Sequence, residues 1–272
     1  MPDITTSVVN TIRKHFVTLS CVQKNAANGL DKCLVFSGFI VEVAGEWTYI
    51  TAGHILRDIR LALSKGATFD LWQLGDQTAG SPYSEAPIPY GFNEQDWIVI
   101  EDESLGLDYG ATHISWLYRR QLEAGGVSAI GKDAWSDHVT EYDFWAFIGI
   151  PSESINYINN TTFSAKLAFV PLTEVEQPPG AENRAANQFY ATPTRQLSHR
   201  FPDPDGLSGG PVFSLKKVDS VWLYNLIGIQ SGWYPQAKVL AICPFTSFGA
   251  PLEEFFLEAM DQFTSEGSDG AA

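Results

Sequence analysis

About a dozen short, β-rich segments run through this chain, and they constrain its fold more than any other feature. They include FVTLSCV at 16–22, WTYITA at 47–52, FWAFIGI at 144–150 and VWLYNLIGIQS at 221–231. Turn-forming residues such as Gly, Pro, Asn and Asp separate many of them. Many short strands joined by turns predict an all-β barrel or sandwich architecture.

Three other segments have a helical period. Apolar residues recur at every fourth position between residues 4 and 12, which predicts an N-terminal helix. HILRDIRLALSKG at 54–66 predicts a second helix that ends near Gly66. PLEEFFLEAMDQF predicts a C-terminal helix over 251–264, with Pro251 in its first turn.

The composition indicates a folded, acidic protein. Of the 272 residues, 44% are hydrophobic and 13% are aromatic, which is enough to bury a sizeable core. Lys and Arg number 17 against 32 Asp and Glu, so the net charge is −15. Because this charge repels phosphate backbones and anionic lipid surfaces, we expect neither nucleic acid nor a membrane as partner.

The three cysteines, Cys21, Cys33 and Cys243, are few, odd in number and widely spaced. We expect inert thiols in a reducing compartment, the cytoplasm, with a Cys21–Cys33 disulfide or one reactive thiol as the alternatives. The start of the chain lacks the apolar core of a secretory signal, which favours the same location. The spacings Cys-x-x-Cys and His-x-x-x-His do not occur, so we expect no metal and no other cofactor.

The segment GLSGGPV at 206–212 sets one serine among three glycines. Glycine in ordered backbone costs about 0.5–1 kcal/mol relative to alanine, so this density indicates a tight turn or a backbone that closely approaches a ligand. A nucleophilic Ser208 would need a base and a group that orients the base. Among the five histidines, His54 is the best candidate because it stands where a β-rich run ends and a helix begins.

The segments TAGH at 51–54 and GLSGGPV at 206–212 resemble the two signature motifs of the trypsin-like, or chymotrypsin-fold, serine proteases. In that family Thr-Ala-Ala-His carries the base, and Gly-x-Ser-Gly-Gly-Pro carries the nucleophile. Three flanking stretches resemble family strands in the same order: VFSGFIVEV at 35–43, FWAFIGIP at 144–151 and LIGIQSGW at 226–233. The resemblance implies an all-β fold of two six-stranded antiparallel barrels, with a short helix after the histidine.

The resemblance also implies a domain organisation. The implied units are a first barrel at 16–125 carrying His54 and Asp108 and a second barrel at 126–250 carrying Ser208. The residue pattern adds an N-terminal helical segment at 1–15, a C-terminal helix at 251–264 and a disordered tail at 265–272.

The third catalytic residue of the family is an aspartate followed by an apolar strand. LDYGATHI offers Asp108, and EQDWIVIE offers Asp96. We favour Asp108, because DWIVIED is typical of the strand before the loop and Asp108 then opens the next strand. Asp96 stays open as the alternative.

By this resemblance the chain is a serine endopeptidase that cleaves protein or peptide substrates. Ser208 would attack the peptide carbonyl, His54 would move the proton, and Asp108 would hold the imidazole. The backbone N–H groups of Gly206 and Ser208 would form the oxyanion hole. The alternative is a catalytically latent fold of the same type, which acts as a protein-binding module or needs a regulatory protein partner.

Two departures from the family pattern point to its bacterial intracellular members. Leu207 stands where many secreted members have an aspartate that pairs with a freed N-terminus, and the usual disulfide framework is missing. The substrate-binding positions implied by the family are Pro202 and Asp203 before the serine, and Ser231, Gly232 and Trp233 after it. The order SGW replaces the usual Ser-Trp-Gly, so Trp233 is expected to alter the pocket.

Overall fold

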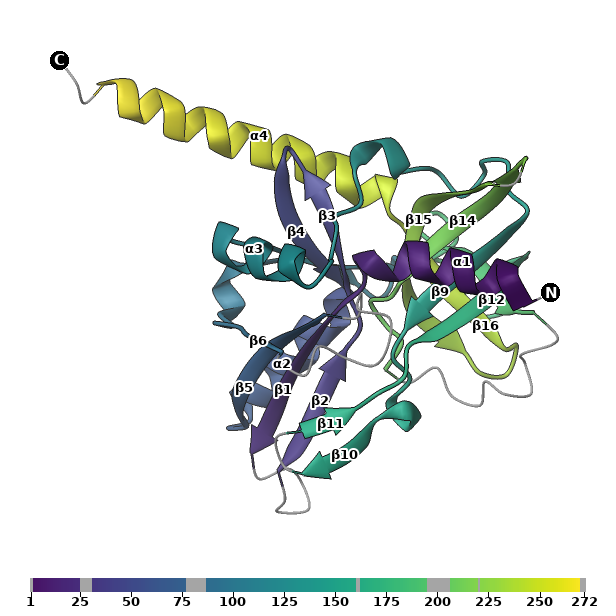
Figure 1. Cartoon of the computed structure of the whole chain (residues 1–272), viewed down its shortest axis with the longest axis horizontal. Coiled ribbons are helices and arrows are strands. Elements are labelled where there is room, and N and C mark those ends of the chain that lie inside the picture. The colour runs from purple at the N-terminus through teal and green to yellow at the C-terminus, as the bar shows by residue number, and fades with distance from the viewer. Residues whose placement is uncertain are drawn as a thin grey trace.

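The computed structural model describes residues 2–24, 31–76, 87–159, 162–194, 206–219 and 221–269. Within these ranges the chain is mostly β, with one closed six-stranded barrel, two open four-stranded sheets and one two-stranded ribbon. Four α-helices and several short 3₁₀ turns accompany the strands (Figure 1).

The closed barrel belongs to the C-terminal half of the chain. Its antiparallel strands follow the order β12-β13-β16-β15-β14-β9, and β9 also pairs with β12, which closes the ring. The strands are β9 (Phe144–Gly149), β12 (Ala168–Val175), β13 (Phe189–Pro193), β14 (Pro211–Val218), β15 (Val221–Tyr234) and β16 (Val239–Pro244). The ribbon of β10 (Asn156–Asn159) and β11 (Thr162–Ser164) is a separate two-stranded sheet.

The N-terminal half differs from the closed six-stranded barrel predicted over 16–125. Its eight strands form two open sheets, of order β2-β1-β5-β6 and β3-β4-β8-β7. The strands are β1 (Val17–Lys24), β2 (Lys32–Phe36), β3 (Phe39–Val43), β4 (Glu46–Thr51), β5 (Thr68–Asp76), β6 (Ile88–Pro89), β7 (Trp97–Asp102) and β8 (Leu107–His113).

The two open sheets meet at one corner of the described structure. There Phe16 forms a single bridge with Phe39, and the Val17 amide donates to the Gly38 carbonyl at 3.0 Å. At the far end of its sheet, β6 has only two residues, which is too short to extend a ladder to the second sheet. The sheets instead pack face to face around a shared apolar cluster that includes Leu19, Ile40, Tyr49, Leu74 and Trp97.

The helices are α1 (Pro2–Ile12), α2 (Gly53–Ser64), α3 (Trp116–Ala124) and α4 (Thr246–Asp269). Helix α3 begins soon after β8, which ends at His113. Helix α4 is longer than the predicted 251–264, begins before Pro251 and runs on into residues assigned to a disordered tail. Pro251 has no backbone N–H to donate within the helix. The first turn of α4 forms nevertheless, because the Phe245 carbonyl accepts from the amides of Phe248 and Gly249.

The largest apolar cluster joins the two halves of the chain. Residues from the open sheets, the barrel and the start of α4 share it, among them Phe39, Ile50, Tyr109, Ile148, Phe213, Ile229, Phe245 and Phe248. Helix α1 adds Val8 and Ile12 to the same cluster. This shared core holds the segment after β4 and the segment before β14 at a fixed distance.

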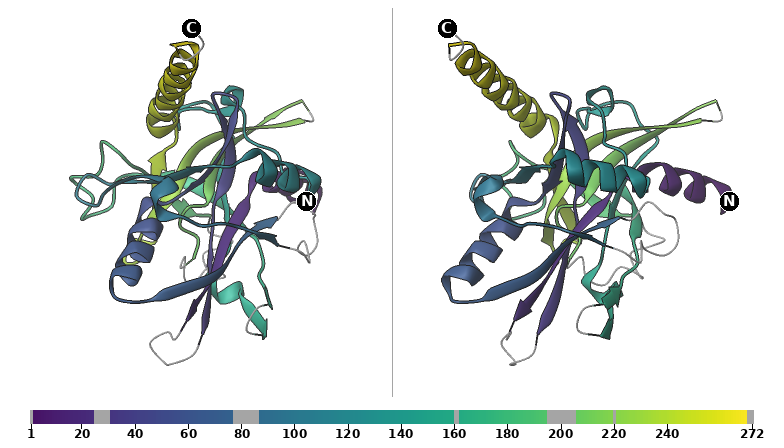
Figure 2. Two further views of the ribbon diagram at one scale, coloured as in Figure 1. Left: turned by 90° about the vertical axis from the view of Figure 1, so that its left-hand side faces the viewer. Right: turned by 60° about the vertical axis from the view of Figure 1, so that its left-hand side comes forward.

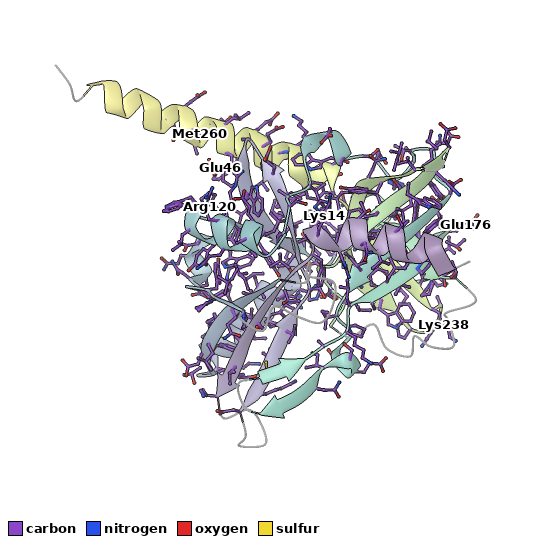
Figure 3. All side chains as sticks on the ribbon, in the orientation of Figure 1. Lys14, Glu46, Arg120, Glu176, Lys238 and Met260 are labelled. Atoms are coloured by element: carbon purple, nitrogen blue, oxygen red, sulfur yellow. The ribbon has the colours of Figure 1, made fainter. Side chains whose placement is uncertain are left out.

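The distal part of α4 extends away from the sheets in every view (Figures 1 and 2). Met260, labelled on this part in Figure 3, has 45% of its surface exposed. Among the described helices, none combines the length and the apolar character needed to cross a membrane.

Candidate active site

His54 lies at the junction of β4 and α2. The strand ends at Thr51, Ala52 keeps extended backbone, and the helix begins at Gly53. A Cβ added at Gly53 would lie 2.9 Å from the Tyr109 carbonyl oxygen, so glycine lets the start of α2 pack directly on β8. This contact places the imidazole at the edge of a rigid sheet.

Asp108, the second residue of β8, binds His54 at two points. Its Oδ2 accepts from the His54 Nδ1 at 2.7 Å, and its Oδ1 accepts from the His54 backbone amide at 2.7 Å. The Ser231 hydroxyl donates to the same Oδ2 at 2.7 Å. The Asp108 side chain is only 9% exposed, so these bonds act away from bulk water. With Nδ1 engaged as donor, the Nε2 of His54 is the nitrogen left to act as a base.

Asp96, the alternative, lies elsewhere. It ends a 3₁₀ turn, is exposed, and its Oδ1 accepts from the Asn93 side-chain amide at 2.9 Å. The structure therefore brings Asp108, and not Asp96, to the imidazole of His54.

The pKa of His54 is raised above its ordinary value by a balance of opposing effects. Burial is the largest single effect and disfavours the charged imidazolium. The hydrogen bond from Nδ1 to Asp108 and the negative charges of Asp108 and Asp58 favour the imidazolium, and together they outweigh burial and the charge of Arg57. His54 therefore holds a proton more readily than a free histidine.

Hydrogen bonds from the barrel hold the segment that carries Asp108. The Gln188 side-chain amide donates to the Gly106 carbonyl at 3.0 Å, and the Cys243 thiol donates to the same carbonyl at 3.2 Å. One residue beyond Asp108, the Tyr109 hydroxyl donates to the Pro244 carbonyl at 2.9 Å. Asp108 is thus fixed by contacts from both halves of the chain.

The Ser208 turn uses its glycines for conformation and for close approach. Gly206 and Gly209 have φ values of +83° and +88°, which residues with a Cβ rarely adopt. A Cβ at Gly209 would lie 2.3 Å from the Thr51 Oγ1 and 3.0 Å from the Ala52 amide nitrogen. The turn is therefore packed against the residues that lead into His54.

Ser208, Gly206 and His54 line one cavity of about 490 Å³. In the described part of the chain, the Ser208 hydroxyl makes no hydrogen bond to the imidazole of His54. Nor do the amides of Gly206 and Ser208 donate to any described residue. The cavity walls are mostly apolar and include Leu34, Phe36, Ile55, Phe69 and Ile155.

A second cavity, of about 280 Å³, adjoins the other side of the His54–Asp108 pair. Ser231, Gly232 and Trp233, three of the positions expected to bind substrate, are among the residues that line it. The Trp233 ring is partly buried against the barrel core. The other two predicted pocket residues, Pro202 and Asp203, and also His199, lie outside the described residues.

The remaining described histidines and the cysteines lie outside the His54–Asp108 pair. His15 is buried between Ser128 and Tyr224, His113 is bonded to Glu46, and His138 stacks on Phe189. Cys21 and Cys243 are buried free thiols, and burial raises the pKa of Cys33 to about 11 and that of Cys243 to about 12. Among the described residues no group of three or more His, Cys, Asp or Glu is arranged to hold a metal ion.

Sequence reasoning missed Ser37, which lies between β2 and β3 and is fully buried. Its hydroxyl donates to the Gly206 carbonyl at 2.9 Å. A serine beside Gly38 predicts only a turn, and nothing near it in the chain indicates a partner so far away in the sequence.

No family model matches the sequence, and no curated protein matches it. Among solved structures, it is similar to the thermostable serine protease AL20 from an extremophilic microorganism, with 17% identity, a TM-score of 0.47, and coverage of 89% of this chain and 95% of that one. It is also similar to the protease Anisep from Arthrobacter nicotinovorans, with 17% identity, a TM-score of 0.41, and coverage of 85% and 90%. The serine protease domain of the Sesbania mosaic virus polyprotein has 10% identity, a TM-score of 0.43, and coverage of 86% and 90%.

Proposed function

We propose that this chain is a serine endopeptidase of the chymotrypsin-fold type, with Ser208 as nucleophile, His54 as base and Asp108 as the group that orients the base. The observation that carries the proposal is the bond from His54 Nδ1 to Asp108 Oδ2 at 2.7 Å, next to a cavity that His54 shares with Ser208. In this proposal the fold has two β units. The two open sheets together form the first unit, and the closed barrel is the second.

In the proposed reaction the Ser208 Oγ attacks the carbonyl carbon of a peptide bond while its proton passes to the His54 Nε2. The imidazolium that forms is stabilised by the carboxylate of Asp108. The tetrahedral intermediate collapses, the C–N bond breaks, and the leaving amine takes the proton from Nε2. Water then hydrolyses the acyl-enzyme by the same proton path and frees Ser208.

The Gly206 and Ser208 amides are the proposed donors to the oxyanion. Both residues line the cavity, and their N–H groups have no acceptor among the described residues, which leaves them available for a substrate oxygen. A preorganised donor of this kind lowers the barrier by about 2.7–4 kcal/mol. The left-handed backbone of Gly206 supports this assignment, because a side chain there would strain the turn.

Turnover of a peptide library by the purified chain tests this function, with Ser208→Ala as the inactive variant. We expect the wild-type chain to cleave and the variant to lose about 10⁴-fold or more in kcat/KM. Ser214→Ala is the matched control: Ser214 is also buried, but it lies on β14, outside the cavity. Equal activity in wild type and Ser208→Ala contradicts the proposal.

The second candidate is a latent or partner-activated form of the same fold. It is favoured by one observation, that Ser208 and His54 share a cavity without a hydrogen bond between them. Catalytic bonds are often looser before substrate binds, so the endopeptidase proposal does not require this bond in the free chain. A cellular effect that survives Ser208→Ala would favour the binding function. For both candidates we propose a protein or peptide ligand and a cytoplasmic location, which the buried free thiols of Cys21 and Cys243 support.

A further inference from the structure

Ser37 lies where three separate segments of the chain meet. Its hydroxyl donates to the Gly206 carbonyl at 2.9 Å and accepts from the Ile150 amide at 3.0 Å. Its carbonyl accepts from the Thr51 hydroxyl at 2.8 Å. One side chain and one carbonyl thus join the end of β4, the end of β9 and the start of the Ser208 turn.

The Ser208 turn is held at both ends, and Ser37 holds the first end. At the second end the Gly209 amide donates to the Gln230 carbonyl at 2.9 Å. Between these points the Gly210 amide donates to the Leu207 carbonyl at 3.0 Å, which closes the turn, and the Leu207 side chain is fully buried. Gly206 has no side chain to hold it, so the bond from Ser37 is its described polar anchor.

Gly206 has a φ of +83°, and glycine can adopt several other backbone conformations when no hydrogen bond holds its carbonyl. A carbonyl bound to Ser37 restricts the rotation of Gly206 and therefore the direction of its amide. Space around this residue is also restricted, since a Cβ at Gly206 would lie 2.5 Å from the Ser152 Oγ and 2.9 Å from the Ile150 carbonyl. The hydrogen bond and the close packing favour the same orientation.

We propose that Ser37 is a positioning residue that keeps the Gly206 amide directed at the substrate oxyanion. This inference rests on the proposed endopeptidase function and adds to it a residue that does not touch the reacting atoms. Ser37 acts through Gly206, so its removal raises the barrier of the acylation step and leaves substrate binding in the ground state nearly unchanged.

The test compares wild type, Ser37→Ala and Ser214→Ala in peptide hydrolysis. Active sites are counted by complete labelling of Ser208 with a fluorophosphonate, so that kcat refers to folded enzyme alone. For Ser37→Ala we expect kcat to fall by about 10- to 100-fold with KM within about twofold of wild type. The affinity of a peptide aldehyde, which forms an oxyanion on reaction with Ser208, should fall by the same factor as kcat/KM. Ser214→Ala should match wild type in all three measurements.

An unchanged kcat, or a raised KM with unchanged kcat, overturns the role of Ser37. If wild type itself neither labels at Ser208 nor turns over, the endopeptidase function fails, and the role of Ser37 fails with it for that separate reason. If Ser37→Ala does not fold, Ser37→Cys replaces it, because a thiol keeps an atom at the γ position but is a weaker donor and acceptor. Its kcat should fall less than tenfold but measurably at constant KM, and a kcat equal to wild type overturns the proposal.

Discussion

The Asp108 carboxylate holds His54 at two points. One oxygen accepts from the ring Nδ1, and the other accepts from the backbone amide of the same histidine. This arrangement fixes both the ring plane and the tautomer, which a single hydrogen bond would not do. Ser231 donates a third bond to the same carboxylate, which further stabilises its charge in this nearly buried site.

The raised pKa of His54 predicts the acid limb of the activity profile. The base must be neutral to accept the Ser208 proton, so activity increases as pH rises through the pKa of His54. Because that pKa is above 6.5, the midpoint of kcat/KM should lie on the alkaline side of 6.5. Hydrolysis rates of a neutral peptide from pH 5 to 9 measure it, and a flat profile would contradict the role of His54.

Substitution of Asp108 separates orientation from charge. Asp108→Asn keeps the size of the side chain but loses the acceptor charge, so His54 is no longer held with its proton on Nδ1. We expect kcat to fall by about 10³- to 10⁴-fold with little change in KM. Asp96→Asn, at the exposed alternative position, should retain wild-type kinetics. The reverse result for the two variants would assign the role to Asp96.

Motif residues could be predicted from the sequence because each motif is local. Thr51 to His54 and Gly206 to Gly210 are contiguous, and each carries its own turn or strand signal. The aspartate that orients His54 could be narrowed only to two candidates, Asp108 and Asp96. The contact between Asp108 and His54 depends on how β8 pairs with β4, which the local sequence does not indicate. Ser37 could not be predicted, because its partners at 150 and 206 are far away in the sequence.

At the scale of elements, His15 ties the 3₁₀ turn after α1 to the rest of the molecule. Its Nδ1 donates to the Ser128 carbonyl at 2.6 Å, and its Nε2 accepts from the Tyr224 hydroxyl at 2.7 Å. Burial, together with the neighbouring charge of Lys14, lowers the pKa of His15 to about 4, although the bond to Ser128 partly offsets this. The neutral ring is therefore part of the folded state.

This lowered pKa predicts a pH-dependent stability. The unfolded chain binds a proton at His15 near pH 6.5 and the folded chain near pH 4, so folding is weakened as pH falls through this window. The loss amounts to about 3 kcal/mol at the lower end. Urea unfolding of wild type and His15→Gln at pH 4 to 7.5 should show a smaller loss in the variant. His113→Gln, at an exposed histidine, is the control and should follow wild type; identical slopes for all three proteins would contradict the prediction.

Elements were predicted well where one periodic pattern dominates and less well where packing decides. Strands β9 and β15 and helix α2 follow from local pattern. Whether the first half of the chain closes into a barrel does not follow from local pattern. A two-residue β6 and a corner at Ser37–Gly38 leave its two sheets open. Helix α4 begins earlier than the pattern around Pro251 predicts, because the Phe245 carbonyl supplies the acceptor for a turn before that proline.

At the scale of the whole molecule, the two halves share one apolar core, and the candidate site lies where they meet. Phe245 is fully buried there, between Phe39 of the open sheet and Trp135 before the barrel. A site assembled from both halves persists only while this contact holds.

The shared core predicts that the halves unfold together. Phe245→Ala should lower the free energy of unfolding by about 3–5 kcal/mol and keep a single transition. Calorimetry measures this as equal calorimetric and van't Hoff enthalpies. Phe255→Ala, at an exposed phenylalanine of α4, is the matched control and should change stability by less than about 0.5 kcal/mol. Two separate transitions in wild type would show that the halves fold independently.

The most direct test of the whole account is the rate at which a fluorophosphonate labels Ser208, followed by peptide mapping of the labelled site. We expect one label per chain, confined to Ser208, with a rate that falls by at least about 10³-fold in His54→Ala. Labelling at Ser208 that is as fast without His54 as with it, or no labelling of that serine at all, would contradict the assembly of nucleophile and base on which the proposed chemistry depends.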